Sequence, residues 1–324
     1  MNHNRRNFIK KSATIVAATS AASLVLQPVT AQTISTPKTT STKDKFWPNG
    51  AQLVISISMQ FEAGAQGIKA QGGPFPPMEG GYIDTITPTW FDYGMQEGIP
   101  RLLDLWDKHG VKVTSHMVGK AVELRPDLAR DVVERGHEAA AHGYNWTPQY
   151  SMTPDEERRS YEKNIEIVEK VTGQRPVGFN AFWLRQTPKT LEILQDLGFT
   201  YHIDDLSRNE PSIIQVRDKP FAIVPYTIIT NDIARFSDIS MTGAAFEQEL
   251  KDEFDVLYAE GTTRRRMMSI STHDRVAGSP SIIKALDNFL TYARSHDGVI
   301  FMRKDEIARI TLMSDNVPQA KPRS

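Results

Sequence analysis

Segments with the pattern of buried β-strands alternate with amphipathic helical segments over most of this chain. The first strand candidate, residues 52–59 (QLVISISM), is a β-branched run, as is typical of a strand covered on both faces. Six further strand candidates follow at residues 111–117, 137–141, 177–180, 200–203, 221–224 and 267–271. Helical segments at residues 99–108, 126–134, 153–171, 188–197, 244–259 and 279–295 separate most of them. Such units predict an α/β fold with a parallel sheet, and about seven of them in roughly 270 residues predict a distorted (β/α) barrel.

An open, doubly wound sheet is the alternative arrangement of these elements. No glycine-rich dinucleotide-binding fingerprint follows any of the strand candidates, which favours the barrel. Residues 62–98 are rich in Gly and Pro and are expected to form a long loop. No internal repeat or second linker interrupts the pattern, so residues 46–324 are expected to form a single domain.

The amino-acid composition excludes several classes of site and partner. The 324 residues contain no cysteine, which excludes disulfides, thiolate nucleophiles and cysteine-bound zinc. His, Asp and Glu are then the candidate metal ligands. A formal net charge of −1 offers no overall excess of positive charge for binding nucleic acid, so no nucleic-acid partner is expected.

The first 31 residues have the pattern of a twin-arginine-type signal peptide. Residues 4–10 (NRRNFIK) contain the paired arginines, and an apolar run at 13–26 leads to an expected cleavage before Gln32. This run of 14 residues is shorter than the roughly 20 apolar residues that span a bilayer, which disfavours a membrane anchor. The sequence therefore predicts export to the periplasm or the extracellular space, without stable membrane insertion after processing. Residues 32–45, rich in Thr, Ser and Lys, are expected to form a flexible linker.

Polar and aromatic side chains recur where the predicted strands end. The carboxyl ends of parallel barrel strands meet on one face, where active sites are built, so these side chains are expected to lie together. They are Glu62, His142, Asn180, Trp183, Asp204, Asp205, Asn231, Asp232, His273 and Asp274. One such residue is usually a helix cap or a turn residue, but six clusters at equivalent places favour an active face.

Six sequence blocks follow Glu62 in a fixed order. They are GHEAAAHGYNW (136–146), TGQRPVGFN (172–180), LGFTY (197–201), VPYTIITND (224–232), STHDRVAGSP (271–280) and GVIFMRKDEIAR (298–309). Together they resemble the polysaccharide deacetylase (chitooligosaccharide deacetylase homology) superfamily. The resemblance is closer to the branch of peptidoglycan-deacetylase-like enzymes, cyclic imide hydrolases and metal-independent allantoinase-like proteins. It implies that residues 46–324 form a deacetylase-type barrel that hydrolyses carbon–nitrogen bonds other than peptide bonds, and it leaves the substrate open.

Two departures from metal-dependent members of this superfamily concern the metal site. Those members carry paired aspartates after the first strand, whereas this chain has Glu62 followed by Ala63. They also carry a His-x-x-x-His motif, whereas His142 is followed four residues later by Trp146. A catalytic zinc normally takes three protein ligands, so Glu62 and His142 alone make an incomplete site. We expect no cofactor. Zinc or another divalent metal, held by Glu62, His142 and a third residue such as His116, is the alternative.

The remaining residues suit acid–base hydrolysis of an amide. This reaction needs a base for the attacking water, a donor to the developing oxyanion and an acid for the leaving nitrogen. Glu62 is the candidate base, with a pKa that desolvation by nearby aromatic rings is expected to raise. The resemblance implies that His273 is the general acid, and His142 is a candidate donor to the carbonyl oxygen. Substrate contacts are expected from Tyr144, Trp146, Asn180, Trp183, Asp205 and Asn231. Core packing of the tryptophans and capping by the polar residues are the alternatives.

Three classes of function stay open at this point. The first is a metal-independent hydrolase of a small or cyclic amide, and the second is a metal-dependent N-deacetylase of polysaccharide or peptidoglycan. The third is a non-catalytic relative that binds a glycan or an amide. We favour the first over the second and both over the third. The sequence does not decide whether the protein forms a homo-oligomer.

Overall fold

The computed structural model describes residues 46–65, 73–75, 78, 80–236 and 241–321. The predicted signal peptide (1–31) and linker (32–45) lie outside these residues. Pro48–Gly50 forms a short 3-10 turn that leads into the first strand.

The described strands form one sheet in the order β10-β6-β7-β5-β4-β3-β2-β1-β8, with β9 paired to β1. Their bounds are β1 Leu53–Phe61, β2 Thr114–Met117, β3 Glu138–Ala141, β4 Gly178–Phe179, β5 Tyr201–His202, β6 Ser212–Val216, β7 Lys219–Ile223, β8 Met267–His273, β9 Val299–Phe301 and β10 Gln319–Ala320. The run from β7 through β5, β4, β3, β2 and β1 to β8 is parallel throughout, as predicted.

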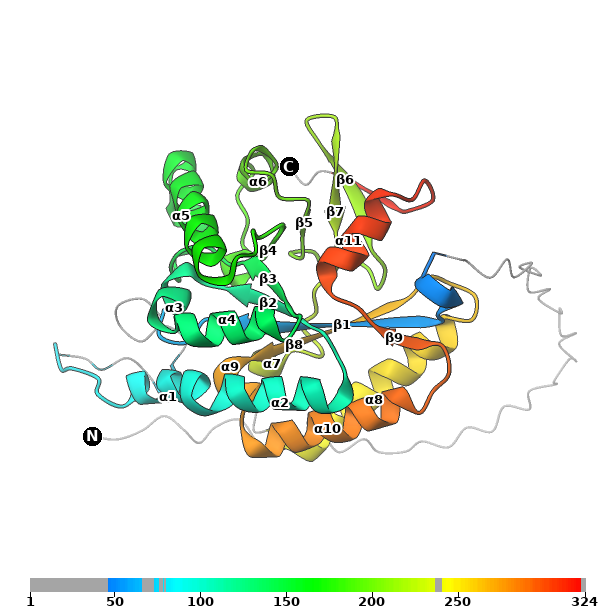
Figure 1. Cartoon of the computed structure of the whole chain (residues 1–324), viewed down its shortest axis with the longest axis horizontal. Helices are drawn as coiled ribbons and strands as arrows, with labels where there is room; N and C mark the ends of the chain where they lie inside the picture. The colour runs from blue at the N-terminus through cyan, green and yellow to red at the C-terminus, as the bar shows by residue number, and fades with distance from the viewer. Residues whose placement is uncertain (1–45, 66–72, 76–77, 79, 237–240, 322–324) are drawn as a thin grey trace, which may run out of the picture. The chain divides into compact units, whose positions relative to one another are not determined.

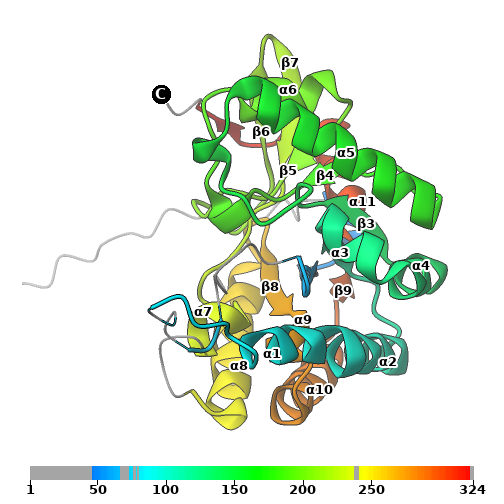
Figure 2. The same cartoon turned by 90° about the vertical axis from the view of Figure 1, so that its left-hand side faces the viewer.

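The sheet curls into a distorted barrel with helices outside it (Figure 2). No continuous ladder joins β7 to β8 among the described residues; a single parallel bridge between Asn231 and Ser271 connects the two edges. The prediction of a distorted α/β barrel is therefore confirmed, and the distortion lies at this seam between β7 and β8.

Three strands escaped the sequence analysis. β6 pairs antiparallel with β7 in a hairpin, while β9 and β10 are short edge strands. The hairpin turn consists of Arg217 and Asp218, both with positive φ (46° and 64°). Two-residue turns with positive φ usually contain Asn or Gly, so this turn carried no recognisable sequence signal.

Helices cover the strands on two sides (Figure 1). The helices are α1 Thr87–Tyr93, α2 Ile99–His109, α3 Gly119–Leu124, α4 Pro126–Glu134, α5 Pro154–Thr172, α6 Thr190–Asp196, α7 Asp232–Phe236, α8 Gly243–Glu260, α9 Asp274–Ala277, α10 Pro280–Arg294 and α11 Lys304–Leu312. The six predicted helices agree with α2, α4, α5, α6, α8 and α10 to within a few residues. Helix α5 shows why: Thr153 and Glu156 form a capping box at its start, and Gly173 ends it in the left-handed conformation.

The expectation that residues 62–98 form a loop is wrong for the second half of that segment. Helix α1 runs directly into a π-helical turn at Gly94–Gly98 and then into α2. Residues 66–72, 76–77 and 79 lie outside the described part of the chain. The high Gly and Pro content concealed the helix because both residue types are poor helix formers in isolation.

Strand β1 presents alternate side chains to two different environments. Leu53, Ile55 and Ile57 are buried in a cluster with α2, α8 and α10. Burial of each such side chain contributes about 1.5–3 kcal/mol. Ser56 and Gln60 have the opposite parity and face the barrel interior, where the Gln60 amide contacts Asn180 at 3.3 Å. Glu62 continues the interior parity beyond the end of the strand.

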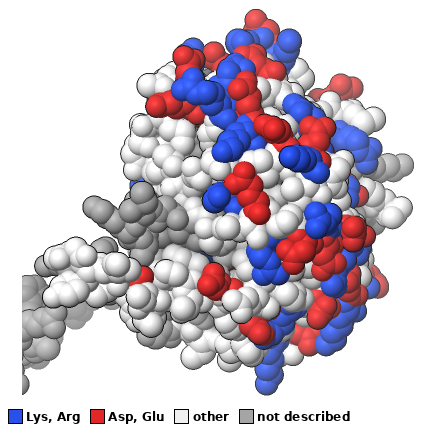
Figure 3. Space-filling model, turned by 60° about the vertical axis from the view of Figure 1, so that its left-hand side comes forward, with Lys and Arg blue, Asp and Glu red and all other residues white. Residues whose placement is uncertain are grey.

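Two observations concern a possible membrane span and the distribution of charge on one face of the molecule. No helix in the described ranges is both long and apolar enough to cross a bilayer. On the face drawn in Figure 3, Lys and Arg side chains intermingle with Asp and Glu, and a broad area without charged side chains lies beside them. Intermingled charge of this kind gives no continuous basic patch on that face.

Candidate active site

A pocket of about 200 Å³ opens at the carboxyl ends of the parallel strands. It is lined by side chains from β1, β8 and the segments that follow β3, β4 and β7. The lining residues are Gln60, Glu62, His142, Trp146, Asn180, Ala181, Phe182, Trp183, Leu184, Tyr226, Asn231, Ile233 and His273. The structure thus brings together the three predicted catalytic residues and four of the six predicted substrate contacts.

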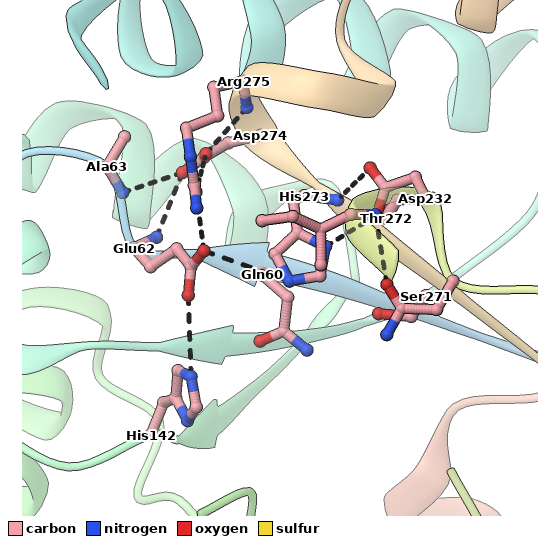
Figure 4. Close-up of polar contacts among 12 residues, drawn as sticks. Gln60, Glu62, Ala63, His142, Asp232, Ser271, Thr272, His273, Asp274 and Arg275 are labelled. Atoms are coloured by element: carbon pink, nitrogen blue, oxygen red, sulfur yellow. Dashed lines mark hydrogen bonds and ion pairs between the residues drawn. The ribbon is translucent and has the colours of Figure 1, made fainter. Parts of the chain in front are cut away.

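Glu62 lies at the centre of the polar contacts (Figure 4). Its carboxylate Oε1 accepts a hydrogen bond from Arg275 Nη1 at 2.6 Å. Oε2 lies 3.6 Å from His142 Nε2, and Oε1 lies 4.0 Å from His273 Nε2. Only 3% of Glu62 is exposed, so these three cationic or ionisable partners act on a nearly dry carboxylate.

The expected rise in the Glu62 pKa is wrong. Burial does act to raise it, but the Arg275 guanidinium and the neighbouring imidazoles of His142 and His273 outweigh burial and lower the pKa from 4.5 to about 2. The sequence analysis considered the aromatic surroundings and overlooked the guanidinium, which favours the ionised carboxylate. At neutral pH Glu62 is therefore an anion and a weak proton acceptor.

His142 is held by the backbone of the next strand. Its Nδ1 lies 2.7 Å from the carbonyl oxygen of Asn180, which can only accept, so Nδ1 carries a proton. Nε2 then faces Glu62 and the pocket. Asn180 is itself fixed, because its amide nitrogen donates to Asp204 at 2.7 Å and its amide oxygen accepts from Gln60. His142 therefore has a defined tautomer and orientation when neutral.

His273 forms a close pair with Asp232. Its Nδ1 lies 2.6 Å from Asp232 Oδ1, and its backbone N–H donates to Asp232 Oδ2 at 2.7 Å. Asp232 is fully buried at the start of α7. Burial alone would lower the His273 pKa, but the charges of Asp232 and Glu62 raise it overall. Asp232 thus directs Nε2 of a readily protonated imidazole into the pocket.

One side of the pocket is aromatic. Trp146 packs edge-on against Phe182 (centroids 5.2 Å apart), and Phe182 stacks on Trp183 at 4.7 Å. Trp183 is 54% exposed and forms the rim. Trp183 and Leu184 both have positive φ, 52° and 59°, a conformation that costs non-glycine residues about 1–3 kcal/mol each and that clusters at functional sites.

Two predicted substrate contacts, Tyr144 and Asp205, do not line this pocket. Tyr144 donates from its hydroxyl to Glu123 and lies under the Lys163 ammonium, 3.6 Å from the ring centroid. Asp205 caps a turn by accepting from the backbone of Ser207, and it lines a separate pocket of about 220 Å³. The sequence located both near strand ends but could not show which way their side chains point.

Three residues of the site were missed as functional candidates: Gln60, Tyr226 and Arg275. Gln60 and Tyr226 line the pocket and bond to each other at 3.1 Å. For Asp232 the sequence left a cap and a ligand contact equally open; the structure places it at the start of α7, where it binds His273. Parity along β1 could have identified Gln60, two residues before Glu62. No local signal identified Arg275, whose partner Glu62 is 213 residues away.

The residues at this site do not fit the metal centre of metal-dependent relatives. Glu62 Oε1 is already occupied by the Arg275 guanidinium, and His142 has no second imidazole four residues later. His116, the suggested third ligand, is buried in the barrel interior and does not line the pocket. Within the described residues no three His, Asp or Glu side chains are grouped as a metal site. We therefore assign no step to a metal.

The fold places the chain among deacetylase-type barrels. A probable polysaccharide deacetylase from Pseudomonas aeruginosa PAO1 superposes with a TM-score of 0.77 and 33% identity, over 83% of this chain and 94% of that one. The solved PuuE allantoinase gives a TM-score of 0.77 and 32% identity, over 83% and 93%. Both proteins share about a third of their residues with this chain over most of its length, so the similarity includes the sequence as well as the fold.

Sequence comparison defines the family. The family model described as polysaccharide deacetylase matches residues 85–202. The peptidoglycan deacetylase of Helicobacter pylori is 24% identical over 290 residues, which is 79% of this chain and 95% of that protein. This chain belongs to the polysaccharide deacetylase family, hydrolases that act on amide carbon–nitrogen bonds. The predicted resemblance is thereby confirmed.

Proposed function

We propose that this protein hydrolyses a small or cyclic amide by acid–base chemistry without a metal. The observation that carries this proposal is the ionised carboxylate of Glu62, paired with Arg275 and flanked by two imidazoles. Three ionisable groups at one pocket supply the functions that amide hydrolysis requires. The likeness to PuuE allantoinase, whose name describes action on a cyclic amide, supports the same class of substrate.

In this mechanism His142 replaces Glu62 as the base. Its Nδ1 proton is committed to the Asn180 carbonyl, so Nε2 accepts a proton from water as the water oxygen attacks the amide carbon. Glu62, 3.6 Å away, stabilises the imidazolium that forms. The Asn231 amide, which lines the pocket, donates to the developing oxyanion.

His273 completes the reaction as the general acid. Its Nε2 proton passes to the leaving nitrogen as the carbon–nitrogen bond breaks, and Asp232 and Glu62 stabilise the protonated form beforehand. The products are a carboxylic acid and an amine, which remain in one molecule when the substrate is cyclic. Exchange with solvent returns both imidazoles to their starting protonation states.

The size of the pocket favours a small substrate. Its volume of about 200 Å³ lies below the roughly 300–1,000 Å³ usual for ligand pockets. Aromatic rings cover one side and charged or amide groups the other, which suits a compact polar ring or a single acylated nitrogen. The name of the Helicobacter pylori relative supports an N-acetylated glycan as the second candidate substrate.

The decisive test compares hydrolysis of cyclic ureides and of N-acetylated glycans, each with and without a chelator. We expect activity that survives chelation and falls by about 10³-fold or more in Glu62→Gln. Glu123→Gln, which alters an exposed carboxylate, is the matched control and should retain activity. Activity that chelation abolishes and zinc restores would instead identify a metal-dependent deacetylase. Binding without turnover on every substrate would identify a non-catalytic relative.

We also propose that the protein is exported by the twin-arginine route. The supporting observation is the sequence of residues 4–31, with Arg5 and Arg6 followed by a short apolar run. Cell fractionation should find the wild-type protein outside the cytoplasm in processed form. Replacement of both arginines by lysine should retain it unprocessed in the cytoplasm, and unchanged export of that variant would contradict the proposal.

A further inference from the structure

A second pocket lies at the seam of the barrel, where no continuous ladder joins β7 to β8 among the described residues. Its volume is about 240 Å³, slightly larger than the 200 Å³ or so of the candidate active site. Strand β8 contributes Met267 and Ser269 to one wall, and residues 225–229, which follow β7, form another. We refer to this cavity as the seam pocket.

Apolar side chains reach the exposed rim of the seam pocket. Leu206, Ile228 and Ile229 line it, and each is about half exposed. Covering such side chains with an apolar group stabilises a complex by about 25 cal/mol per Å² of surface removed from water. The charged lining residues, Arg208 and Glu253, have opposite signs. The seam pocket therefore favours an apolar group over an ionic one.

Tyr226 is shared by the seam pocket and the active-site pocket. No other described residue lines both cavities. Tyr226 directly follows Pro225 in the wall of the seam pocket, and its side chain reaches Gln60 and Asn231 in the wall of the active-site pocket. Its ring therefore lies between the two cavities and separates them.

The Tyr226 ring is held at both ends. Its hydroxyl oxygen accepts from the amide nitrogens of Gln60 at 3.1 Å and Asn231 at 3.4 Å, and it also contacts the Ser271 hydroxyl. Because amide nitrogens can only donate, the hydroxyl proton of Tyr226 is directed at Ser271. The Tyr226 backbone N–H donates to the carbonyl oxygen of Asp205 at 3.0 Å. The ring is therefore a fixed wall of the active-site pocket.

We propose that Tyr226 determines the size of the acyl group that the active site accepts, because its ring closes the site against the seam pocket, a latent subsite for an apolar acyl chain. The inference deepens the proposed function and rests on it for the orientation of the amide. Asn231, the proposed oxyanion donor, contacts the Tyr226 hydroxyl, which places the carbonyl and its acyl group on the Tyr226 side of the pocket. Without the ring, the joined cavities would enter the range of roughly 300–1,000 Å³ that is usual for ligand pockets.

The experiment measures binding of 4-phenylbutanamide by calorimetry, so its outcome does not depend on turnover. This probe joins one amide group to a long apolar acyl chain. Wild type is compared with Tyr226→Ala, with Tyr226→Phe, which keeps the ring, and with Tyr226→Ala/Ile229→Trp, which fills the seam pocket again. We expect Tyr226→Ala to bind the probe at least about 10-fold more tightly than wild type, which corresponds to burial of about 60 Å² of apolar surface. The other two variants should bind it within about threefold of wild type.

Several outcomes would overturn the inference. Equal affinity of wild type and folded Tyr226→Ala would show that the ring does not restrict the site, and an equal gain in Tyr226→Phe would attribute the restriction to the hydroxyl. A gain that persists in the double variant would place the chain outside the seam pocket. If Tyr226→Ala does not fold, Tyr226→Leu takes its place with a smaller expected gain, of about threefold. Failure of both to fold would make the ring a structural requirement and reject the inference.

The same measurement separates this inference from the proposed function. The expected gain in affinity, combined with no hydrolysis of any amide by wild type, would support the partition and contradict the proposed reaction. Hydrolysis of small amides by wild type, with no gain in Tyr226→Ala, would support the reaction and reject the role of Tyr226.

Discussion

Each end of the barrel buries a glutamate side chain, and the pKa values of the two carboxyl groups shift in opposite directions. At the mouth, where the carboxyl ends of the parallel strands form the pocket, Glu62 contacts the Arg275 guanidinium and its pKa falls to about 2. At the floor, the opposite end where the parallel strands begin, Glu138 is the first residue of β3 and is equally buried, yet its pKa rises to about 7. Burial by itself raises the pKa of both carboxyl groups, so desolvation does not explain the difference.

The hydrogen-bond and charge partners of the two carboxyl groups explain the difference in pKa. Glu138 accepts from the hydroxyls of Thr114 and Tyr201, both at 2.7 Å, and from the backbone N–H of Asp305 at 3.1 Å. These donors are neutral, and the nearby Asp305 charge adds to the rise in pKa. The buried ammonium of Lys304, also at the floor, donates to Ser56 at 3.3 Å. A direct contact with a permanent cation therefore separates a reactive anion from a structural acid.

The buried lysine confirms how unfavourable charge is at the floor. Burial lowers the Lys304 pKa to about 7, and the Glu138 charge only partly opposes this. The mouth thus maintains ions for chemistry, whereas the floor joins β2, β3, β5 and α11 through groups that are close to neutral. Substitutions at the two ends should accordingly affect different properties.

The largest effect is expected for Asp232→Asn at the mouth. The change removes the charge that stabilises protonated His273 and places an amide beside Nδ1, so kcat should fall by about 10²–10⁴-fold. Steady-state kinetics normalised to the folded fraction measures this, with Asp232→Glu as a partial rescue. A kcat within threefold or so of wild type would show that the Asp232–His273 pair does not support the reaction.

The floor should affect stability and leave catalysis unchanged. Glu138→Gln replaces an acceptor oxygen by an NH₂ group that cannot accept from Thr114 and Asp305, so unfolding free energy at pH 5 should drop by about 1–3 kcal/mol. Urea denaturation measures the loss, and kcat per folded molecule should stay within about twofold of wild type. A catalytic defect at full stability would contradict the separation of the two ends.

The pH dependence of stability should have opposite signs at the two ends. Since the folded pKa of Glu62 is about 2 and the reference value 4.5, its contribution to stability is present above 4.5 and is lost as pH falls towards 2. For Glu138, with a folded pKa of about 7, stability instead falls as pH rises from 4.5 through 7. Unfolding free energies of wild type, Glu62→Gln and Glu138→Gln across pH 2–8 should yield two difference curves of opposite slope. Parallel curves would refute the comparison.

The smallest effect is expected for Lys304→Met. The ammonium makes one long hydrogen bond and is largely discharged near pH 7, so an apolar side chain of similar length should change stability by less than about 1 kcal/mol. The variant should also lose the gain in stability that wild type shows as pH rises from 7 towards 10.5. Thermal unfolding at pH 7 and pH 9 measures both, and a large loss at pH 7 would mean that Lys304 is a charged structural anchor.

Local patterns were sufficient for the framework of the fold and for part of the site. Runs of β-branched and other apolar residues identified the seven parallel strands, because parallel strands are covered on both faces. Since all their carboxyl ends meet on one side, Glu62, His142 and His273 could be assigned to one pocket without coordinates. The β6–β7 hairpin was missed because its turn, Arg217 and Asp218, lacks the usual residues.

Electrostatic character required the tertiary structure. The sequence identified Glu62 as a buried carboxylate near aromatic rings, from which a raised pKa followed; only the docking of α9 against β1 brings Arg275 to 2.6 Å and reverses the sign. Asp232 likewise gains its role from a contact 41 residues away, with His273. Strand position depends on periodicity along the chain, whereas pKa depends on the few ångströms between groups from different elements. Neighbouring residues therefore determine strand position, whereas the pKa of a buried group is set only after the sheet and helices have packed around it.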